Sequence, residues 1–211
     1  MIKSQAQQLM QRLTFPIEAQ TELLSKLDLI LQTPKYANAF LAVLDIYNKD
    51  RFNFDTILRK TKSLAKKVGI CEYTAYMLLF VCLAPKLYER YKQNGISDEI
   101  FYNTMLDLKY KLEECRLIYS KVGTFVETWL TGLFEMKIFG IGRLQYKIAK
   151  TDFDCDVDGL HIPKGTKAIC VHIPRTGTKL EHTLVLESYK MAAEFFADQL
   201  DGRIIFICTS W

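Results

Sequence analysis

Residues 166–179 read TKAICVHIPRTGTK and place a β-type run directly before a short turn that contains one glycine. The run Thr166–Ile173 is rich in apolar and β-branched side chains, and the amphipathic pattern after the turn predicts a helix. A strand, a tight turn and a helix start bring backbone N–H groups to a point where a phosphate could bind. The stretch therefore predicts a β-containing fold with a candidate anion-binding turn.

The sequence pattern changes at residues 140–142, which read Gly-Ile-Gly. Before this point apolar residues recur at helical spacing, which predicts helices over about residues 4–14, 17–32, 35–48, 53–67, 72–93, 97–121 and 124–138. After it come three β-like runs, with the amphipathic helix between the last two: Leu144–Ala149, Thr166–Ile173 and Arg203–Cys208. We therefore expect an α+β chain, with an all-helical N-terminal domain over residues 1–139 and a mixed sheet with one packed helix over residues 140–211.

Two prolines add local expectations. Pro85 lies within the fifth helical pattern, where its missing N–H and its ring should kink or split the helix. Residues 162–165 read Ile-Pro-Lys-Gly, which has the residue types of a tight turn. The turn predicts a hairpin that pairs residues 161–162 with Thr166–Ile173.

The composition is that of an ordinary globular protein, with 49% hydrophobic and 25% charged residues. The formal net charge is +4, which is too small to indicate nucleic-acid binding by itself. The whole excess of basic residues lies before residue 141. A basic surface, if one exists, is therefore expected on the helical domain.

The six cysteines form no C-x-x-C pair, which is typical of free thiols in a reducing compartment. The N-terminal residues lack the apolar core of a signal peptide. The longest apolar run, Ala75–Pro85, is too short to span a bilayer. We therefore expect a cytoplasmic protein that does not associate with membranes.

Asp154, Asp156, Asp158 and Gly159 follow the spacing of the first half of a calcium-binding loop. Calcium coordination in that loop needs a bidentate glutamate at the twelfth position, which here is Gly165. The flanking segments also read as strands, whereas the calcium loop joins two helices. We interpret the acidic residues as a solvated strand edge or turn.

Residues 64–75 imitate a DNA-binding helix-turn-helix, with a basic helix, a glycine turn and a second helix start. The second helix continues with the apolar run 76–83, which offers almost nothing to contact base edges. A nucleic-acid partner is therefore disfavoured. The basic residues of the preceding helix form either a solvated face or a patch for an acidic small molecule: Arg59, Lys60, Lys62, Lys66 and Lys67.

The three histidines, His161, His172 and His182, are scattered along the chain. No pair of them has the spacing of metal ligands, so the sequence predicts no metal site.

Several short groups of residues resemble, in order and spacing, a bacterial family of acyltransferase-domain proteins. Members of this family pair a helical N-terminal domain with a C-terminal domain similar to the GNAT superfamily of N-acetyltransferases. The matching groups include Gly123, Trp129-Leu130, Gly132, Leu133-Phe134, Gly142-Arg143-Leu144-Gln145-Tyr146, Val171–Pro174, Phe195-Phe196 and Cys208-x-Ser210-Trp211. The resemblance implies a partial GNAT-like sheet and a GNAT-like acyltransferase. Such an enzyme moves an acyl group from acetyl-CoA or another acyl-CoA to an acceptor, which the sequence does not identify.

The resemblance also implies a binding site for the acyl-CoA. In GNAT-like sites the pantetheine pairs with free backbone groups of one strand, which here contains Val171 and Ile173 and stops pairing at Pro174. The pyrophosphate then meets backbone N–H groups near the start of the following helix. The candidate residues of this second part are Arg175, Gly177, Thr178 and Lys179.

Two residues are candidates for the chemistry of acyl transfer, which needs a base and hydrogen-bond donors for the developing oxyanion. His172 is the one imidazole on the implied strand, and Ser210 is a possible donor. A single histidine in a strand is also compatible with a purely structural role.

The sequence departs from the GNAT pattern in two ways. The usual pyrophosphate loop has two small residues, Arg/Gln-x-x-Gly-x-Gly/Ala, whereas residues 175–179 contain one glycine. The printed sequence also ends at Trp211, where GNAT domains continue, so we expect an incomplete C-terminal domain. An alternative is therefore a non-catalytic module that binds a ligand or partner. Its open edge at Arg203–Trp211 could also form a homodimer.

Overall fold

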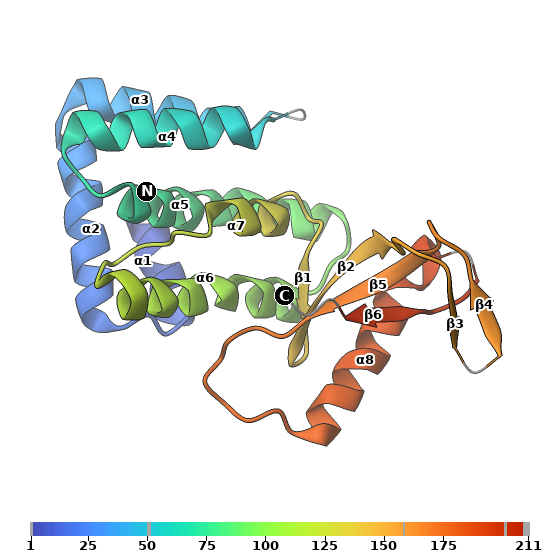
Figure 1. Cartoon of the computed structure of the whole chain (residues 1–211). Coiled ribbons are helices and arrows are strands. Elements are labelled where there is room, and N and C mark those ends of the chain that lie inside the picture. Colours follow the sequence, from blue (N-terminus) through green and yellow to red (C-terminus); the bar gives the residue numbers. More distant parts are fainter. Residues whose placement is uncertain (1, 50–51, 158, 201, 209–211) are drawn as a thin grey trace. The chain divides into compact units, whose positions relative to one another are not determined.

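The computed structural model describes residues 2–49, 52–157, 159–200 and 202–208 (Figure 1). The chain forms two compact units. The helical unit contains residues 1–97 and 105–134, and the sheet unit contains residues 98–104 and 135–211. The predicted fold class is confirmed, because the helices of the first unit are followed by a small mixed sheet with one packed helix.

The helices before residue 135 follow the sequence expectation to within a few residues. They are α1 Ile2–Arg12, α2 Ile17–Gln32, α3 Pro34–Tyr47, α4 Phe54–Val68, α5 Glu72–Gln93, α6 Asp98–Tyr119 and α7 Glu127–Phe134. The largest difference is at α7, which stops four residues before the expected end at residue 138. Met136 adopts φ of 55°, a left-handed conformation that an α-helix cannot continue through.

Local interactions define both ends of α4. The Asn53 side chain accepts a hydrogen bond from the Thr56 N–H at 2.8 Å and so caps the first turn. At the other end, Gly69 has φ of 77° and donates its N–H to the Ala65 carbonyl. Lys66 and Lys67 occupy the last turn, where a positive charge interacts favourably with the helix dipole.

The central helix of this unit is α5, which packs against α1, α2, α3, α4 and α7. All side chains from Thr74 to Val81 are buried, so this part of the helix contacts protein on every side. The helix runs unbroken through Pro85, so the expected split does not occur. Burial of the neighbouring Leu83, Ala84 and Leu87 offsets the single backbone hydrogen bond that the proline removes.

The segment between α6 and α7 lies directly on the first turn of α5. The Thr124 N–H donates to the Tyr73 carbonyl at 3.0 Å, and the Thr74 hydroxyl donates to the Val122 carbonyl at 2.7 Å. Between them lies Gly123, where a Cβ atom would approach the Tyr73 carbonyl carbon to 2.3 Å. Only glycine fits at this position without a backbone shift.

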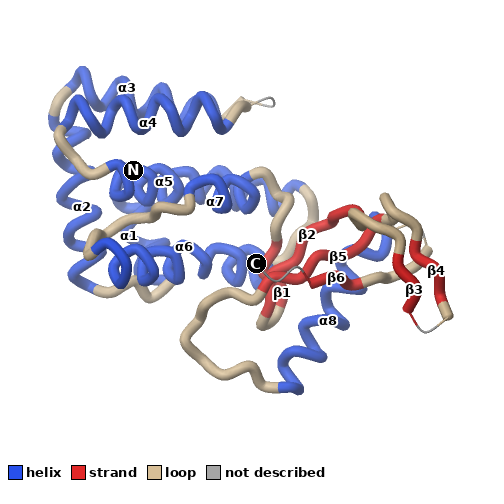
Figure 2. Tube along the Cα trace, in the orientation of Figure 1, coloured by secondary structure: helices blue, strands red, loops and turns tan. Residues whose placement is uncertain are grey.

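The sheet has the order β1-β2-β5-β6, in which the first three strands are antiparallel neighbours and β6 pairs parallel with β5 (Figure 2). The strands are β1 Phe139–Ile141, β2 Leu144–Lys150, β5 Lys167–His172 and β6 Phe206–Cys208. The sequence patterns predicted β2, β5 and β6. They did not predict β1, which is only three residues long.

The first residues of α6 belong to the sheet unit because β1 lies against them. The Gly140 N–H donates to the Thr104 hydroxyl at 2.8 Å. A Cβ atom on Gly140 would lie 2.6 Å from the Asn103 carbonyl carbon, so this close approach of two backbones also requires glycine.

The predicted hairpin between residues 161–162 and 166–173 is wrong. Strand β4, Leu160–Ile162, pairs instead with β3, Cys155–Val157, in a separate two-stranded sheet. After β4 the chain turns toward the end of β2, where the Gly165 N–H donates to the Thr151 carbonyl and the Thr151 N–H donates to the Thr166 carbonyl. This places β5 beside β2, where six residue pairs form a longer ladder than the short β4 could offer.

One face of the four-stranded sheet is covered by α8, His182–Phe196, which is followed by a short 3-10 helix, Ala197–Gln199. Tyr189 of α8 lies among the aromatic rings of the sheet, with ring centroids 4.6 Å from Phe206 and 6.1 Å from Tyr146. In the described part of the chain, β6 pairs on one side only, so it is an edge strand. None of the described helices has both the length and the hydrophobicity to cross a bilayer.

Replacement of Gly123 by alanine should lower the free energy of unfolding by about 3 kcal/mol, because the new methyl group overlaps backbone atoms of Tyr73 that cannot rotate away. The matched control is Gly95→Ala, where no atom lies within 4 Å and φ is 68°. That variant should lose about 1 kcal/mol from the left-handed backbone alone. Guanidinium unfolding followed by circular dichroism measures both, and equal losses would contradict the steric argument.

Candidate functional site

The stretch that follows β5 is an exposed loop, residues 173–181, which leads to α8. Helix α8 begins at His182 with Glu181 as its N-cap residue. The sequence expectation placed the N–H groups of residues 177–180 at the helix start, whereas the structure places these residues in the loop before it. The candidate residues Arg175, Gly177, Thr178 and Lys179 are all exposed there.

Threonine hydroxyl groups give the loop an internal structure. The Thr176 and Thr178 hydroxyls are hydrogen-bonded at 2.8 Å, and the Thr178 N–H donates to the Thr176 hydroxyl at 3.3 Å. Gly177 between them has φ of 72°, which explains the single glycine of the predicted turn. Arg175 and Lys179 flank this turn, and neither forms an ion pair with a described residue.

Arg143 joins this loop to the β1–β2 hairpin. It lies in the hairpin turn, and its Nη2 donates to the Thr176 hydroxyl at 2.7 Å and to the Thr178 carbonyl at 3.3 Å. Its Nε and Nη1 are buried and have no hydrogen-bond partner among the described residues. Buried donors are rarely left unpaired in proteins, and a guanidinium that retains free donors is suited to an anion with several oxygens.

Ser188 of α8 is fully buried and forms hydrogen bonds with the turn of the β1–β2 hairpin. The Ser188 hydroxyl donates to the Ile141 carbonyl at 2.5 Å and accepts from the Leu144 N–H at 3.3 Å. Because its own proton is used on Ile141, the 2.8 Å contact with Tyr146 is a hydrogen bond donated by the tyrosine hydroxyl. Gly142, with φ of 57°, lets the turn lie directly on Ser188.

The phenol of Tyr146 is a structural donor. Burial raises the pKa of Tyr146 to about 12. The hydroxyl therefore keeps its proton at neutral pH and maintains the bond to Ser188.

His172 is the last residue of β5 and is half-buried. Its Cα partner on β2 is Gln145, so both side chains lie on the sheet face opposite to Tyr146 and Val171. The Gln145 side chain is buried, and its Oε1 has no hydrogen-bond partner among the described residues. The candidate base thus lies beside an amide group that is open to a further hydrogen bond.

The two candidate residues of the pantetheine strand have different surroundings. Val171 is buried on the α8 face, opposite Tyr146 on one side and Cys208 on the other. The described parallel pairing with β6 ends at this residue. Ile173 follows β5, is 50% exposed and has no strand partner among the described residues.

Ser210 lies outside the described residues, so the structure does not place the second candidate for the chemistry. No group of three histidine, cysteine or acidic side chains in the described ranges could hold a metal ion. Sequence reasoning missed Arg143, Gln145 and Thr176. Only the resemblance gave a signal for Arg143 and Gln145, because polar side chains next to a glycine turn are common and their pairing is not visible in sequence.

Two family models together match nearly the whole chain. Residues 4–136 match the N-acyltransferase N-terminal domain, and residues 138–211 match the GNAT-like C-terminal domain. The chain belongs to the N-acyltransferase N-terminal domain family. The resemblance inferred from the sequence is therefore confirmed. None of the curated proteins matches the chain.

Several solved structures with a similar fold are acyltransferases. One, in complex with decanoyl-CoA and teicoplanin, is 20% identical with a TM-score of 0.63, and the match covers 90% of this chain and 56% of that chain. An acyltransferase mutant in complex with octanoyl-CoA is 19% identical with a TM-score of 0.64, and the match covers 92% of this chain and 56% of that chain. The likeness shows the fold, and the chain spans just over half the length of these two relatives.

Replacement of Ser188 by alanine should lower the free energy of unfolding by about 2–3 kcal/mol, because it removes the hydrogen bond to the Ile141 carbonyl and the acceptor of the buried Tyr146 hydroxyl. The matched control is Thr183→Ala, which removes an exposed hydroxyl from the same helix and should cost little. Urea unfolding followed by circular dichroism measures both variants. Similar stabilities of the two variants would contradict the role given to Ser188.

Stability at alkaline pH should report on Tyr146. The folded state holds the phenol proton up to a pKa of about 12, above the ordinary value of 10, so this stabilisation is complete below about pH 10 and is lost as the pH rises toward 12. Between pH 9 and pH 11 both proteins should lose unfolding free energy. The loss should be smaller in Tyr146→Phe than in the unmodified protein, by roughly the free energy that corresponds to one pKa unit. If the unfolding free energies of the two proteins fell in parallel with pH, Tyr146 would have an ordinary pKa.

Proposed function

We propose that this protein transfers an acyl group from an acyl-CoA to an acceptor. The observation that carries the proposal is Arg143, which connects the hairpin turn to the threonine-bonded loop while two of its buried donors stay unpaired. This arrangement lies after the strand and before the helix, where the GNAT-like resemblance expects a pyrophosphate. Similar folds have been solved with decanoyl-CoA and octanoyl-CoA, which supports the same donor class here.

The residues around the loop fit a pyrophosphate. Arg143 can donate to phosphate oxygens from Nε and Nη1 after a small opening of its surroundings, while Nη2 continues to hold the loop. Arg175 and Lys179 supply two further positive charges at the loop surface, and the exposed backbone of Gly177 supplies an N–H group, with the exposed Thr178 beside it. The bound group would thus be an anion with several oxygens.

The acyl-CoA supplies a thioester, whose carbonyl carbon the acceptor amine attacks. The new C–N bond forms as the C–S bond breaks, the amine proton passes to a base, and the departing sulfur takes up a proton to leave as the CoA thiol. We assign the base to His172, with the Gln145 amide beside it as a group that can orient the reacting atoms. Ser210 is the proposed donor to the developing oxyanion.

The acyl group and the acceptor stay open within this proposal. Acetyl-CoA and longer acyl-CoA thioesters are both candidates. Teicoplanin is bound by one of the similar acyltransferases and is a first acceptor to test. We also propose the cytoplasm as the compartment, because all six cysteines are free thiols.

The second candidate is a non-catalytic binding module, and the edge position of β6 favours it. An unpaired strand edge can bind another chain through backbone hydrogen bonds, either a partner or a second copy that meets residues 203–211. Residues 209–211 of this segment lie outside the described residues.

Titration calorimetry with CoA and acetyl-CoA tests the first proposal. The unmodified chain should bind, Arg143→Met should bind at least about tenfold more weakly, and so should the double variant Arg175→Glu/Lys179→Glu, because each change removes or reverses charge at the pyrophosphate. The matched control, Lys150→Glu/Lys164→Glu, makes the same change in net charge at exposed positions away from the loop and should bind normally.

If Arg175→Glu/Lys179→Glu and Lys150→Glu/Lys164→Glu lost equal affinity for CoA, only the net charge would matter, and the assigned site would be contradicted. Failure of a folded, unmodified sample to bind either ligand would overturn the acyl-CoA proposal for this chain. Sedimentation of the same sample then tests the alternative, since a concentration-dependent dimer that is lost on Ile207→Lys would support pairing through β6.

A further inference from the structure

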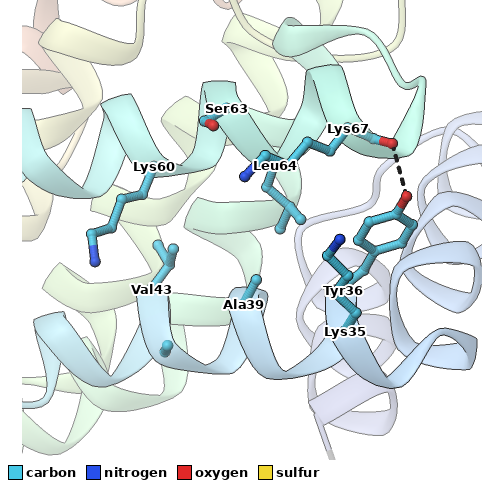
Figure 3. A pocket seen from close by; sticks show the side chains of 9 residues that line it. Lys35, Tyr36, Ala39, Val43, Lys60, Ser63, Leu64 and Lys67 are labelled. Atoms are coloured by element: carbon cyan, nitrogen blue, oxygen red, sulfur yellow. Dashed lines mark hydrogen bonds between the residues drawn. The ribbon is translucent and has the colours of Figure 1, made fainter.

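A pocket in the helical unit is not used by the proposed function. It lies between α3 and α4, has a volume of about 240 Å³ and is lined by side chains of these two helices alone (Figure 3). It belongs entirely to the helical unit and shares no residue with the loop around Arg143. The inference below does not rest on acyl transfer.

Three lysines surround this pocket. Lys35 comes from α3, and Lys60 and Lys67 come from α4. None of them forms an ion pair with a described residue, whereas the neighbouring Lys62 is paired with Glu72 at 2.7 Å. Unpaired ammonium groups that gather at one concave site repel one another, and an anion bound between them relieves this repulsion.

The floor of the pocket is apolar. Val43 and Leu64 are 3% and 5% exposed and form its base, while the small side chains of Ala39 and Ala42 leave the space above them open. At one end the Tyr36 hydroxyl donates to the Lys67 carbonyl at 3.0 Å, which joins the two helices (Figure 3). An apolar surface beside several unpaired positive charges suits a ligand that has both an apolar part and a negatively charged group.

The charges are arranged along the groove. Figure 3 shows the Lys35 side chain extending from α3 toward α4, the Lys67 side chain running along α4 past Leu64, and Lys60 further along α4. Lys60 and Lys67 are seven residues apart in one helix, which corresponds to a separation of roughly 10 Å. The apolar floor lies between these positions.

We propose that this pocket binds a small amphipathic anion, with a carboxylate or phosphate on Lys35 and Lys67 and a short apolar body on the floor toward Lys60. A protein partner is disfavoured by size, because a stable protein interface involves about 20–30 residues a side, and nine residues line this pocket. The volume is slightly below that of sites for drug-sized ligands, which fits a ligand of roughly ten non-hydrogen atoms.

The test uses the full chain and four probes: octanoate, octyl phosphate, inorganic phosphate and the neutral octyl glucoside, all below micelle-forming concentrations. Binding is followed by two-dimensional amide NMR, with the signals of Ala39 and Ser63 reporting on the pocket. The two amphipathic anions should shift these signals with at least about tenfold higher affinity than inorganic phosphate or octyl glucoside, since only they use both the charges and the floor.

Three variants assign the effect to the pocket. Lys35→Gln/Lys67→Gln should weaken the amphipathic anions at least about tenfold, and Ala39→Leu should weaken their binding by filling the space above the floor without changing the response to inorganic phosphate. Lys66→Gln/Lys121→Gln, which neutralises two exposed lysines outside the pocket, should bind as the unmodified chain does.

Equal binding of octyl glucoside would overturn the role of the lysines. Unchanged binding in Lys35→Gln/Lys67→Gln, or shifts confined to residues of the sheet unit, would show that the anions bind elsewhere and would overturn the assigned site. Loss of binding in both lysine double variants would indicate a nonspecific effect of net charge and would also overturn it.

Discussion

The hydroxyl group of Ser188 is the interaction on which the geometry of the sheet unit depends. It is the one polar side-chain group of α8 that is buried among the described residues, and it contacts three positions of the β1–β2 hairpin. Because its proton goes to the Ile141 carbonyl, it must accept from both Leu144 and Tyr146. These three hydrogen bonds to one hydroxyl set the position of the hairpin turn on α8.

The candidate site follows from that constraint. Gly142 allows the turn to approach Ser188 closely, and the next residue, Arg143, then points its guanidinium at Thr176 and Thr178. Arg143 thus ties the loop, whose two threonine hydroxyls are hydrogen-bonded to each other, to the hairpin. Contacts therefore connect α8 to the hairpin and the hairpin to the loop. A group bound at Arg143 would be positioned by the packed sheet.

The helical unit uses a different source of rigidity. Its central helix α5 is buried on all sides between residues 74 and 81, and Gly123 lets the segment before α7 lie against the start of that helix. The outer helices α3 and α4 contact each other through side chains that include small alanines, which leaves the pocket between them. The basic face of α4, which the sequence offered as either a solvated surface or a patch for an acidic small molecule, borders that pocket through Lys60 and Lys67.

The sequence by itself determined the helices of the first unit, the strands β2, β5 and β6, and the family, because each depends on a periodic pattern or on residues close together in the chain. It also located the turn at Gly177, since a left-handed backbone position selects glycine. The tertiary structure alone decided the pairing of β4 with β3, the short strand β1 and the contact between Arg143 and the loop 33–35 residues further on. These features depend on contacts between distant segments, and such contacts leave no period in the sequence. They form only when packing, as at Ser188, brings those segments to one place.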